Sequence, residues 1–249
     1  MTHVLIFGDS HTAAMKRGLV SLREQDSVPH GFEVDVIGLG GGQHMLDRFF
    51  EVSDGRAVMT HTTFAKRLPV VPIPDGAQRG TVYAWCGLFH FAKAWRDRSW
   101  IDFRPSAIPG SRMPLTMGLV TETVLHWLRF QLELLEVVRR TGARVLAVET
   151  PRPFHHHWAL KRIPAEVIAH VDGHLQDLMV RELAKRSIEP VRIPRTCLDD
   201  LGFMNPEWRN EVETDEHHGN AAFGALMIRR VCEHLAAHPA GEEPRGESC

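Results

Sequence analysis

Residues 3–12 read HVLIFGDSHT, a short apolar run that ends in a polar turn. Consecutive apolar residues followed by a glycine are typical of a central parallel strand that is buried on both faces. Residues 13–24 have helical spacing, so Ser10 is expected at a strand-to-helix turn. In open parallel sheets, such turns at the carboxyl ends of the strands hold the working residues.

The alternation of strand and helix patterns continues along the chain. Further strands are expected at 32–37, 81–86, 143–148 and 190–193, and helices at 119–140, 165–186 and 220–237. This alternation indicates a mainly parallel, five-stranded sheet with helices on both faces, an α/β/α sandwich. We predict one domain over 1–238, because chains of this length routinely form one.

Two segments lack a clear pattern. Prolines at 69, 72 and 74 favour an extended excursion over 54–79, so 54–116 is predicted as an irregular insertion that includes the third strand. Residues 239–249 are rich in Glu, Gly and Pro and are predicted to be disordered.

Composition narrows the functional class. The 249 residues carry a formal net charge of −2, which gives no broad electrostatic reason to expect nucleic acid as a partner. No window of about 20 apolar residues could span a bilayer, and no charged, apolar leader precedes the first strand. The four cysteines are scattered, without a Cys-x-x-Cys pair, and read as reduced thiols. We therefore expect a soluble, cytoplasmic protein without a membrane partner.

A second polar motif lies near the other end of the chain, DEHHGNAAFG at 215–224. An aspartate three residues before a histidine, at a turn that opens a helix, can orient the imidazole and fix its tautomer. Asp215 and His218 with Ser10 therefore supply an orienting group, a base and a nucleophile. Ser10 alone could equally cap a helix. His217 is expected to face solvent or to support the site from behind.

These motifs resemble those of the SGNH/GDSL hydrolase family over most of the chain. The resemblance rests on residues 8–12, the glycine run at 38–42, residues 87–90 and the final motif at 215–224. It implies a flavodoxin-like three-layer fold, Ser10 as nucleophile, His218 as general base and Asp215 as its orienting carboxylate. It also implies an oxyanion hole that contains the N–H groups of Ser10 and of Gly41 or Gly42.

The match is incomplete at the third motif. Leu88 and Phe89 stand where the family has an asparagine that donates to the oxyanion. Loss of one such donor costs about 10²–10³ in turnover. His90 resembles a histidine found in some bacterial members, so it either replaces the asparagine or packs beneath Phe89. We keep His90 as a candidate oxyanion donor.

The remaining candidate residues concern the substrate and ligands. We expect the substrate side to be lined by Asp9, His11, Phe89, Arg152 and Phe154. No metal is predicted, since the three consecutive side chains at 155–157 cannot readily converge on one ion. No cofactor is predicted, since Gln43 breaks the dinucleotide fingerprint of the glycine run.

Three functions remain open at this point. The leading one is a serine esterase or deacylase acting on a small-molecule or glycan ester. An acyltransferase or cyclising enzyme would use the same triad but exclude water, with the insertion at 54–116 enclosing the pocket. A binding protein with an impaired oxyanion hole is the third.

Overall fold

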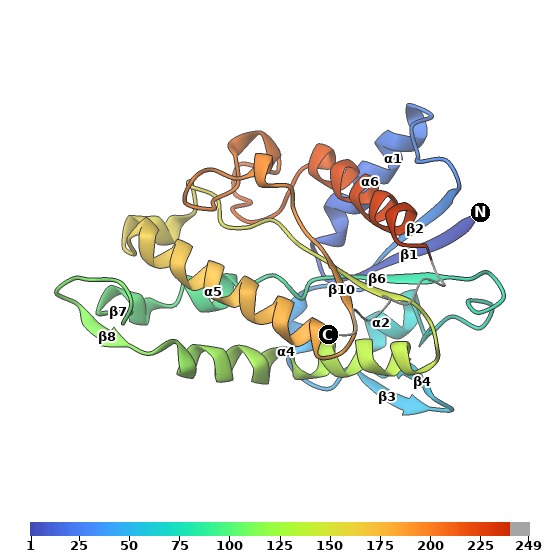
Figure 1. Ribbon diagram of the computed structural model, residues 1–249, viewed down its shortest axis with the longest axis horizontal. Coiled ribbons are helices and arrows are strands. Elements are labelled where there is room, and N and C mark those ends of the chain that lie inside the picture. The colour runs from blue at the N-terminus through green and yellow to red at the C-terminus, as the bar shows by residue number, and fades with distance from the viewer. Residues whose placement is uncertain (240–249) are drawn as a thin grey trace, which may run out of the picture.

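The structure is a computed structural model that describes residues 1–239, and a parallel sheet runs through its centre (Figure 1). The strands of this sheet are β1 (Thr2–Gly8), β2 (Phe32–Gly38), β6 (Val82–Cys86), β9 (Val145–Val148) and β10 (Glu189–Val191). They lie in the order β10-β9-β6-β1-β2, and every neighbouring pair is parallel. This is the strand order of flavodoxin-like folds, so the predicted fold class is confirmed, with a sheet that is wholly parallel.

Helices cover both faces of the sheet, as predicted. Helices α1 (Thr12–Glu24) and α6 (Ala221–Ala237) lie on one face, and α4 (Met117–Arg140) and α5 (Ala165–Ala184) on the other (Figure 1). Alternate side chains of β1 enter the two cores: Val4 and Ile6 pack under α1 and α6, whereas Leu5 and Phe7 join the core under α4 and α5. Because both faces are buried, β1 has to be apolar at consecutive positions.

Two glycines bring α1 and α6 into backbone contact. A Cβ on Gly18 would lie 2.2 Å from the backbone nitrogen of Ala225, and one on Gly224 would lie 1.9 Å from the carbonyl oxygen of Ala14. Neither position can hold a side chain at this helix separation. Helix α1 begins directly after Ser10, and α6 begins shortly after His218, so this contact sets the distance between the two halves of the predicted triad.

Residues 50–71 differ from the irregular excursion predicted from 54 onward. They form a small antiparallel sheet of β3 (Phe50–Ser53), β4 (Arg56–Met59) and β5 (Val70–Val71), with α2 (Thr62–Arg67) before the last strand. Asp54 and Gly55 make the hairpin turn at φ of 49° and 73°, and Asp-Gly is a strong hairpin signal. Buried Phe50, Ala57 and Met59 give the hairpin an inner face. That part of the prediction was wrong, because the strands are too short for their alternation to stand out.

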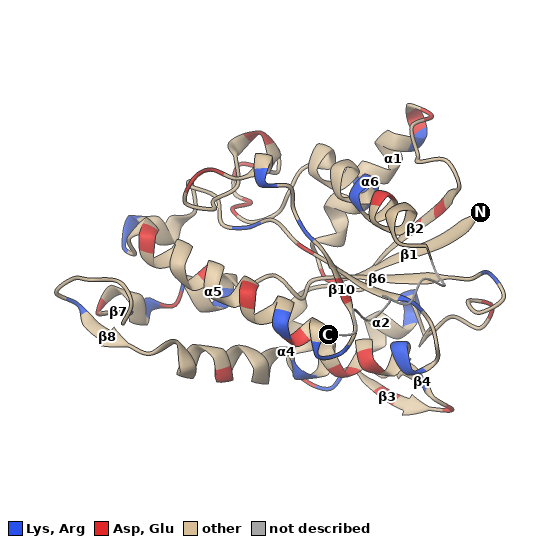
Figure 2. Ribbon diagram, in the orientation of Figure 1, with Lys and Arg blue, Asp and Glu red and all other residues tan. Residues whose placement is uncertain are grey.

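The rest of the chain makes short elements around the sheet. Helix α3 (Ala92–Trp95) follows β6, and β7 (Phe103–Pro105) pairs with β8 (Met113–Leu115). Within residues 1–239, no helix has the length and apolar character needed to cross a bilayer. From residue 240 onward, the tail predicted to be disordered lies outside the described residues. Acidic and basic residues are interspersed along α4 and α5 (Figure 2).

Candidate active site

The end of β1 holds Ser10 at the carboxyl edge of the sheet. Gly8, the last residue of β1, has φ of +154°, and a Cβ there would lie 1.7 Å from the carbonyl oxygen of Cys86. The N–H of Asp9 donates to that same carbonyl at 3.0 Å. Glycine is required because β1 and β6 approach each other closely here. The chain then turns at Ser10 into α1, where the sequence placed it.

Ser10, His218 and Asp215 form a continuous hydrogen-bonded chain. Ser10 Oγ lies 3.0 Å from Nε2 of His218, and Nδ1 of His218 lies 2.9 Å from each carboxylate oxygen of Asp215. A carboxylate accepts only, so Nδ1 carries the imidazole proton and Nε2 is left to accept from the serine hydroxyl. The structure therefore brings the three predicted residues together. Their hydrogen bonds run in the direction that a nucleophile, a base and an orienting group require.

Several donors hold the Asp215 carboxylate in place. It accepts from the backbone N–H of His218 at 3.0 Å and of His217 at 3.3 Å, and from the side-chain amide of Asn210 at 2.7 Å. Burial alone would raise its pKa, but the hydrogen bonds and charge interaction with His218 outweigh burial and hold the pKa below its ordinary value. Asp215 thus stays ionised. Just beyond, Asn220 caps α6 by accepting from the N–H of Phe223 at 2.9 Å.

Four imidazoles gather beside the nucleophile, which we call the histidine cluster: His11, His90, His217 and His218. The ring of His11 lies 4.3 Å from that of His90 and 4.7 Å from that of His218. The ring of His217 lies 4.5 Å from that of His218. His217 therefore packs against the base, His218. Of the two positions expected for it, facing solvent or supporting the site, it takes the second.

Asp9 anchors this cluster. Its Oδ1 accepts from the backbone N–H of His11 at 2.9 Å and contacts Nδ1 of His11 at 3.0 Å. Both residues are almost fully buried. Nε2 of His11 has no hydrogen-bond partner among residues 1–239. Asp9 and His11, two of the five predicted substrate contacts, thus form a buried Asp–His pair. Asp9 also forms part of a cavity wall.

Burial and repulsion between the imidazoles lower the pKa values of His90, His217 and His218. Burial, followed by repulsion from His11, lowers the pKa of His218. Burial and the same neighbour hold the pKa of His90 well below its ordinary value, and burial, then His218, lower the pKa of His217 to about 4. At neutral pH, His218 is therefore in the form that can accept a proton.

A cavity of about 680 Å³ opens beside Ser10, between the start of α1 and the glycine run. Gly41 lines it, whereas Gly42 packs against Asp9, whose Oδ2 would lie 3.2 Å from a Cβ on Gly42. In the described part of the chain, the backbone N–H groups of Ser10 and Gly41 have no hydrogen-bond acceptor. These two donors are thus free. A second cavity, of about 710 Å³, lies at the amino ends of the strands, beside Thr2 and Val82.

Two of the predicted substrate contacts are wrong, and a third is engaged elsewhere. Phe89 and Phe154 are each only 1% exposed and belong to the two cores of the sheet. Nε of Arg152 donates to the buried carboxylate of Glu149 at 2.8 Å, an ion pair that supports the end of β9. The sequence placed all three after strand ends, but it carried no signal for which way each side chain points.

Two basic residues of the cavity were missed at the sequence level. Lys16 lies one helical turn after Thr12, and Arg67 ends α2; both line the cavity with Ser10. The spacing from Thr12 to Lys16 is i to i+4, which places both on one face of α1. This spacing in the sequence could have predicted that Lys16 lies near the site. Arg67 lies in the segment taken as irregular, so nothing in the sequence placed it near Ser10.

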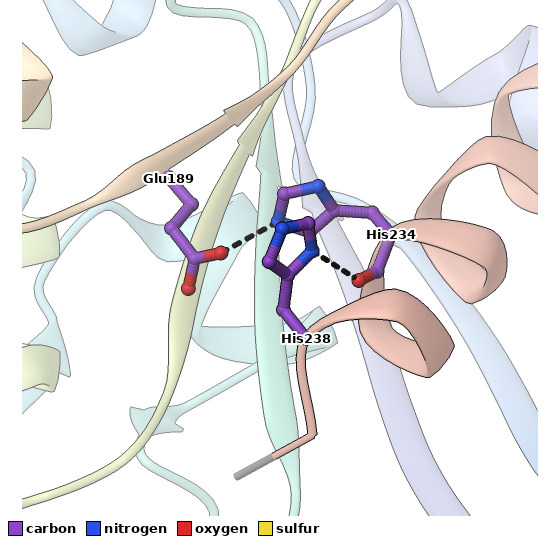
Figure 3. A group of neighbouring side chains, drawn as sticks. All are labelled: Glu189, His234 and His238. Carbon is purple, nitrogen blue, oxygen red and sulfur yellow. Dashed lines mark hydrogen bonds and ion pairs between the residues drawn. The ribbon is translucent and has the colours of Figure 1, made fainter. Parts of the chain in front are cut away.

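Among residues 1–239, two groups of His and carboxylate side chains place their ligand atoms close enough together to be candidate metal sites. One consists of Asp215, His217 and His218; the other, of Glu189, His234 and His238, lies where α6 meets β10 (Figure 3). In each group the carboxylate is already engaged. Asp215 holds His218, and Glu189 binds Arg144 through both oxygens, at 3.2 and 3.0 Å.

Comparison with known proteins gives structural likeness only. No protein-family model matches the chain, and no curated protein matches it. Among solved structures, it is similar to the periplasmic domain of a lipopolysaccharide acetyltransferase from Salmonella ser. Paratyphi A, at 11% identity and a TM-score of 0.49, over 94% of this chain and 83% of that one.

Two further solved structures are similar to this chain to a comparable degree. A GDSL-like lipase from Bacteroides thetaiotaomicron matches at 11% identity and a TM-score of 0.44, over 94% of this chain and 86% of the other. A phospholipase A1 from Streptomyces albidoflavus matches at 12% identity and a TM-score of 0.46, over 93% and 98%. The structure thus resembles structures described as GDSL-like lipase, phospholipase and acetyltransferase, while the chemistry of this chain has to be argued from its own residues.

Proposed function

We propose that the protein is a serine esterase or deacylase of the SGNH type, with Ser10 as nucleophile. One observation carries the proposal: a hydrogen-bonded chain from Ser10 through His218 to Asp215, at distances of 3.0 and 2.9 Å. A helix-capping serine would have no need of an imidazole base held by a carboxylate.

The mechanism follows from the polarity of these bonds. Ser10 Oγ attacks the ester carbonyl while its proton passes to Nε2 of His218, and Asp215 stabilises the imidazolium without taking the proton. The N–H groups of Ser10 and Gly41 would donate to the tetrahedral oxyanion. Nε2 then returns the proton to the departing alcohol. Water, activated by the same nitrogen, attacks the acyl-serine, and collapse of the second tetrahedral intermediate frees the acid and Ser10.

The experiment is covalent labelling with a serine-directed fluorophosphonate, mapped by intact mass and peptide sequencing. We expect labelling at Ser10 in the wild type, none in Ser10→Ala, and a rate at least 10²-fold lower in His218→Ala. Asp215→Asn should be impaired but less severely than loss of the nucleophile. Ser99→Ala, at an exposed residue that does not line the cavity beside Ser10, is the matched control. Unchanged labelling in Ser10→Ala would refute the proposal.

Hydrolysis is distinguished from transfer by the product. With a nitrophenyl ester, a hydrolase releases the free acid whether or not alcohols are added, whereas an acyltransferase forms a new ester and turns over faster with acceptor present. A protein that only binds esters would give neither product. We also propose a cytoplasmic location, supported by the scattered cysteines, of which Cys86, Cys197 and Cys232 are free and buried.

A further inference from the structure

We infer that the cavity beside Ser10 binds an anionic group of the substrate, so that the ester acted upon carries a carboxylate or phosphate in its acyl or alcohol portion. This inference rests on the proposed function for the location of the reacting carbonyl. It is carried by the charges around the cavity, which the mechanism does not use.

The cavity walls contain two cations, Lys16 from α1 and Arg67 from α2. Within residues 1–239, neither has a carboxylate oxygen within 4.0 Å. This contrasts with Arg48, Arg144 and Arg186, each of which binds a glutamate. Lys16 and Arg67 therefore present two positive charges to one cavity, without a carboxylate beside either of them.

Arg67 is held in position by the glycine run. Its Nη1 donates to the carbonyl of Gly38 at 2.7 Å and to that of Leu39 at 3.2 Å. Carbonyl oxygens fix the guanidinium without neutralising its charge. One edge of the group is thereby engaged, while Nε and Nη2 have no acceptor in the described part of the chain. A planar guanidinium with free N–H groups suits the oxygens of a carboxylate or phosphate.

The single acidic residue in the cavity wall does not cancel these charges. Asp9 is 4% exposed, and its Oδ1 is occupied by His11. Gly38, Gly40 and Gly41 add no side chains to the wall, so apart from Asp9 the charged groups that line the cavity are Lys16 and Arg67. The net positive cavity therefore attracts an anion while Ser10 remains accessible at the same wall.

Two pairs of esters test this inference and distinguish where the anion resides. 4-Nitrophenyl hemisuccinate and 4-nitrophenyl butyrate differ by a carboxylate in place of a methyl group on the acyl side. 4-Acetoxybenzoate and phenyl acetate differ by a carboxylate on the alcohol side. For one of the pairs, we expect kcat/KM to favour the anionic member at low ionic strength. The ratio should fall about fivefold in Arg67→Gln and in Lys16→Gln, which is about 1 kcal/mol.

Controls separate charge from other effects of mutation. Lys66→Gln removes a neighbouring cation of α2 that does not line the cavity, and should leave the ratio as in the wild type. Lys16→Arg keeps the charge and should retain most of the preference. Addition of 0.5 M NaCl should reduce the wild-type ratio, because exposed charges are screened.

A binding readout keeps this inference separable from the proposed function. Inorganic phosphate and succinate should each shift the backbone amide resonances of Ser10 and Gly41 in the wild type, and much less in Arg67→Gln. If fluorophosphonate labels Ser10 but neither ester pair favours the anion and neither probe shifts these resonances, the anion site is wrong and the esterase stands. If Ser10 is not labelled while the shifts occur, the esterase proposal fails and the anion site stands.

Discussion

Replacement of Gly18 by alanine is the sharpest test of how α1 and α6 assemble the site. The added Cβ would lie 2.2 Å from the nitrogen of Ala225, 2.4 Å from the carbonyl carbon of Gly224 and 2.9 Å from the carbonyl oxygen of Ala221. All three atoms belong to the backbone of α6 or its first turn, so no side chain can swing away. The helices have to separate by about 1 Å to restore an ordinary contact.

The expected loss combines two opposing effects. Overpacking of a tight interior contact costs about 1–3 kcal/mol, and a rigid backbone neighbour places this case at the upper end. Alanine is about 1 kcal/mol better than glycine inside a helix, which offsets part of the cost. We therefore expect the free energy of unfolding to fall by about 2 kcal/mol. The rate of fluorophosphonate labelling should fall as well, because Ser10 and His218 move apart with the helices.

The assay is urea unfolding followed by circular dichroism, with labelling measured in the absence of urea. Gly173→Ala in α5 is the matched control, since a Cβ there meets nothing within 4 Å. That variant should be as stable as the wild type or gain up to about 1 kcal/mol. If Gly18→Ala and Gly173→Ala proved equally stable and equally reactive, the close helix contact would not govern stability or the triad.

Three further outcomes follow from the same structure. Because burial and His11 lower the pKa of His218, kcat/KM should persist below pH 6.5 and decline only at lower pH, and His11→Gln should move this acid limb upward; an acid limb above pH 6.5 in the wild type would contradict this. Burial raises the pKa of Asp172 to about 7, above its value in the unfolded chain, so its stabilising contribution is complete at low pH and is lost as pH rises towards 7 and beyond. The unfolding free energy of the wild type should accordingly decline more between pH 4 and pH 8 than that of Asp172→Asn, and parallel profiles would refute the assignment. In a Cys249→Ser background, the buried thiols of Cys86 and Cys232, whose pKa values burial raises, should resist iodoacetamide at pH 7.5 and react only in urea; rapid alkylation of the native protein would be inconsistent with their placement.

His90 is the third candidate donor of the oxyanion hole, beside Ser10 and Gly41. Its ring lies in the histidine cluster, and no hydrogen bond ties it elsewhere among residues 1–239. If it donates to the oxyanion, His90→Ala should depress kcat more than it raises KM. A rise in KM alone would instead indicate a binding contact, leaving Ser10 and Gly41 as the donors.

The sequence predicted the sheet and the triad because both produce patterns that stand out from their neighbours. A strand buried on both faces is apolar at consecutive positions, as residues 4–7 are, and an Asp-x-x-His before a helix is a compact motif. The hairpin at residues 50–59 was missed although Asp54-Gly55 signalled its turn, since four-residue strands show too little alternation. Phe89 and Phe154 were misplaced for another reason: in a loop, no periodicity tells a core aromatic from one that faces a ligand.

The sequence could not predict that two positive charges would line the cavity. Lys16 and Arg67 belong to different helices, separated along the chain by β2 and the β3–β4 hairpin, and only the tertiary fold makes them neighbours. The same holds for the histidine cluster, whose members come from three loops that meet at one edge of the sheet. Burial at this edge, followed by repulsion from His11, lowers the pKa of the base, and neither cause can be read from a single motif.

The contact between Ser10 and His218 spans 208 positions of the chain. At a synthesis rate of about 5–20 residues per second, the ribosome makes the nucleophile some 10–40 seconds before its base. During that interval Ser10 is an ordinary alcohol, unable to acylate itself from cellular esters. Contacts of such high sequence separation are also costly to close early in folding. Reactivity should therefore appear only after α6 has docked, which makes serine labelling a reporter of completed folding.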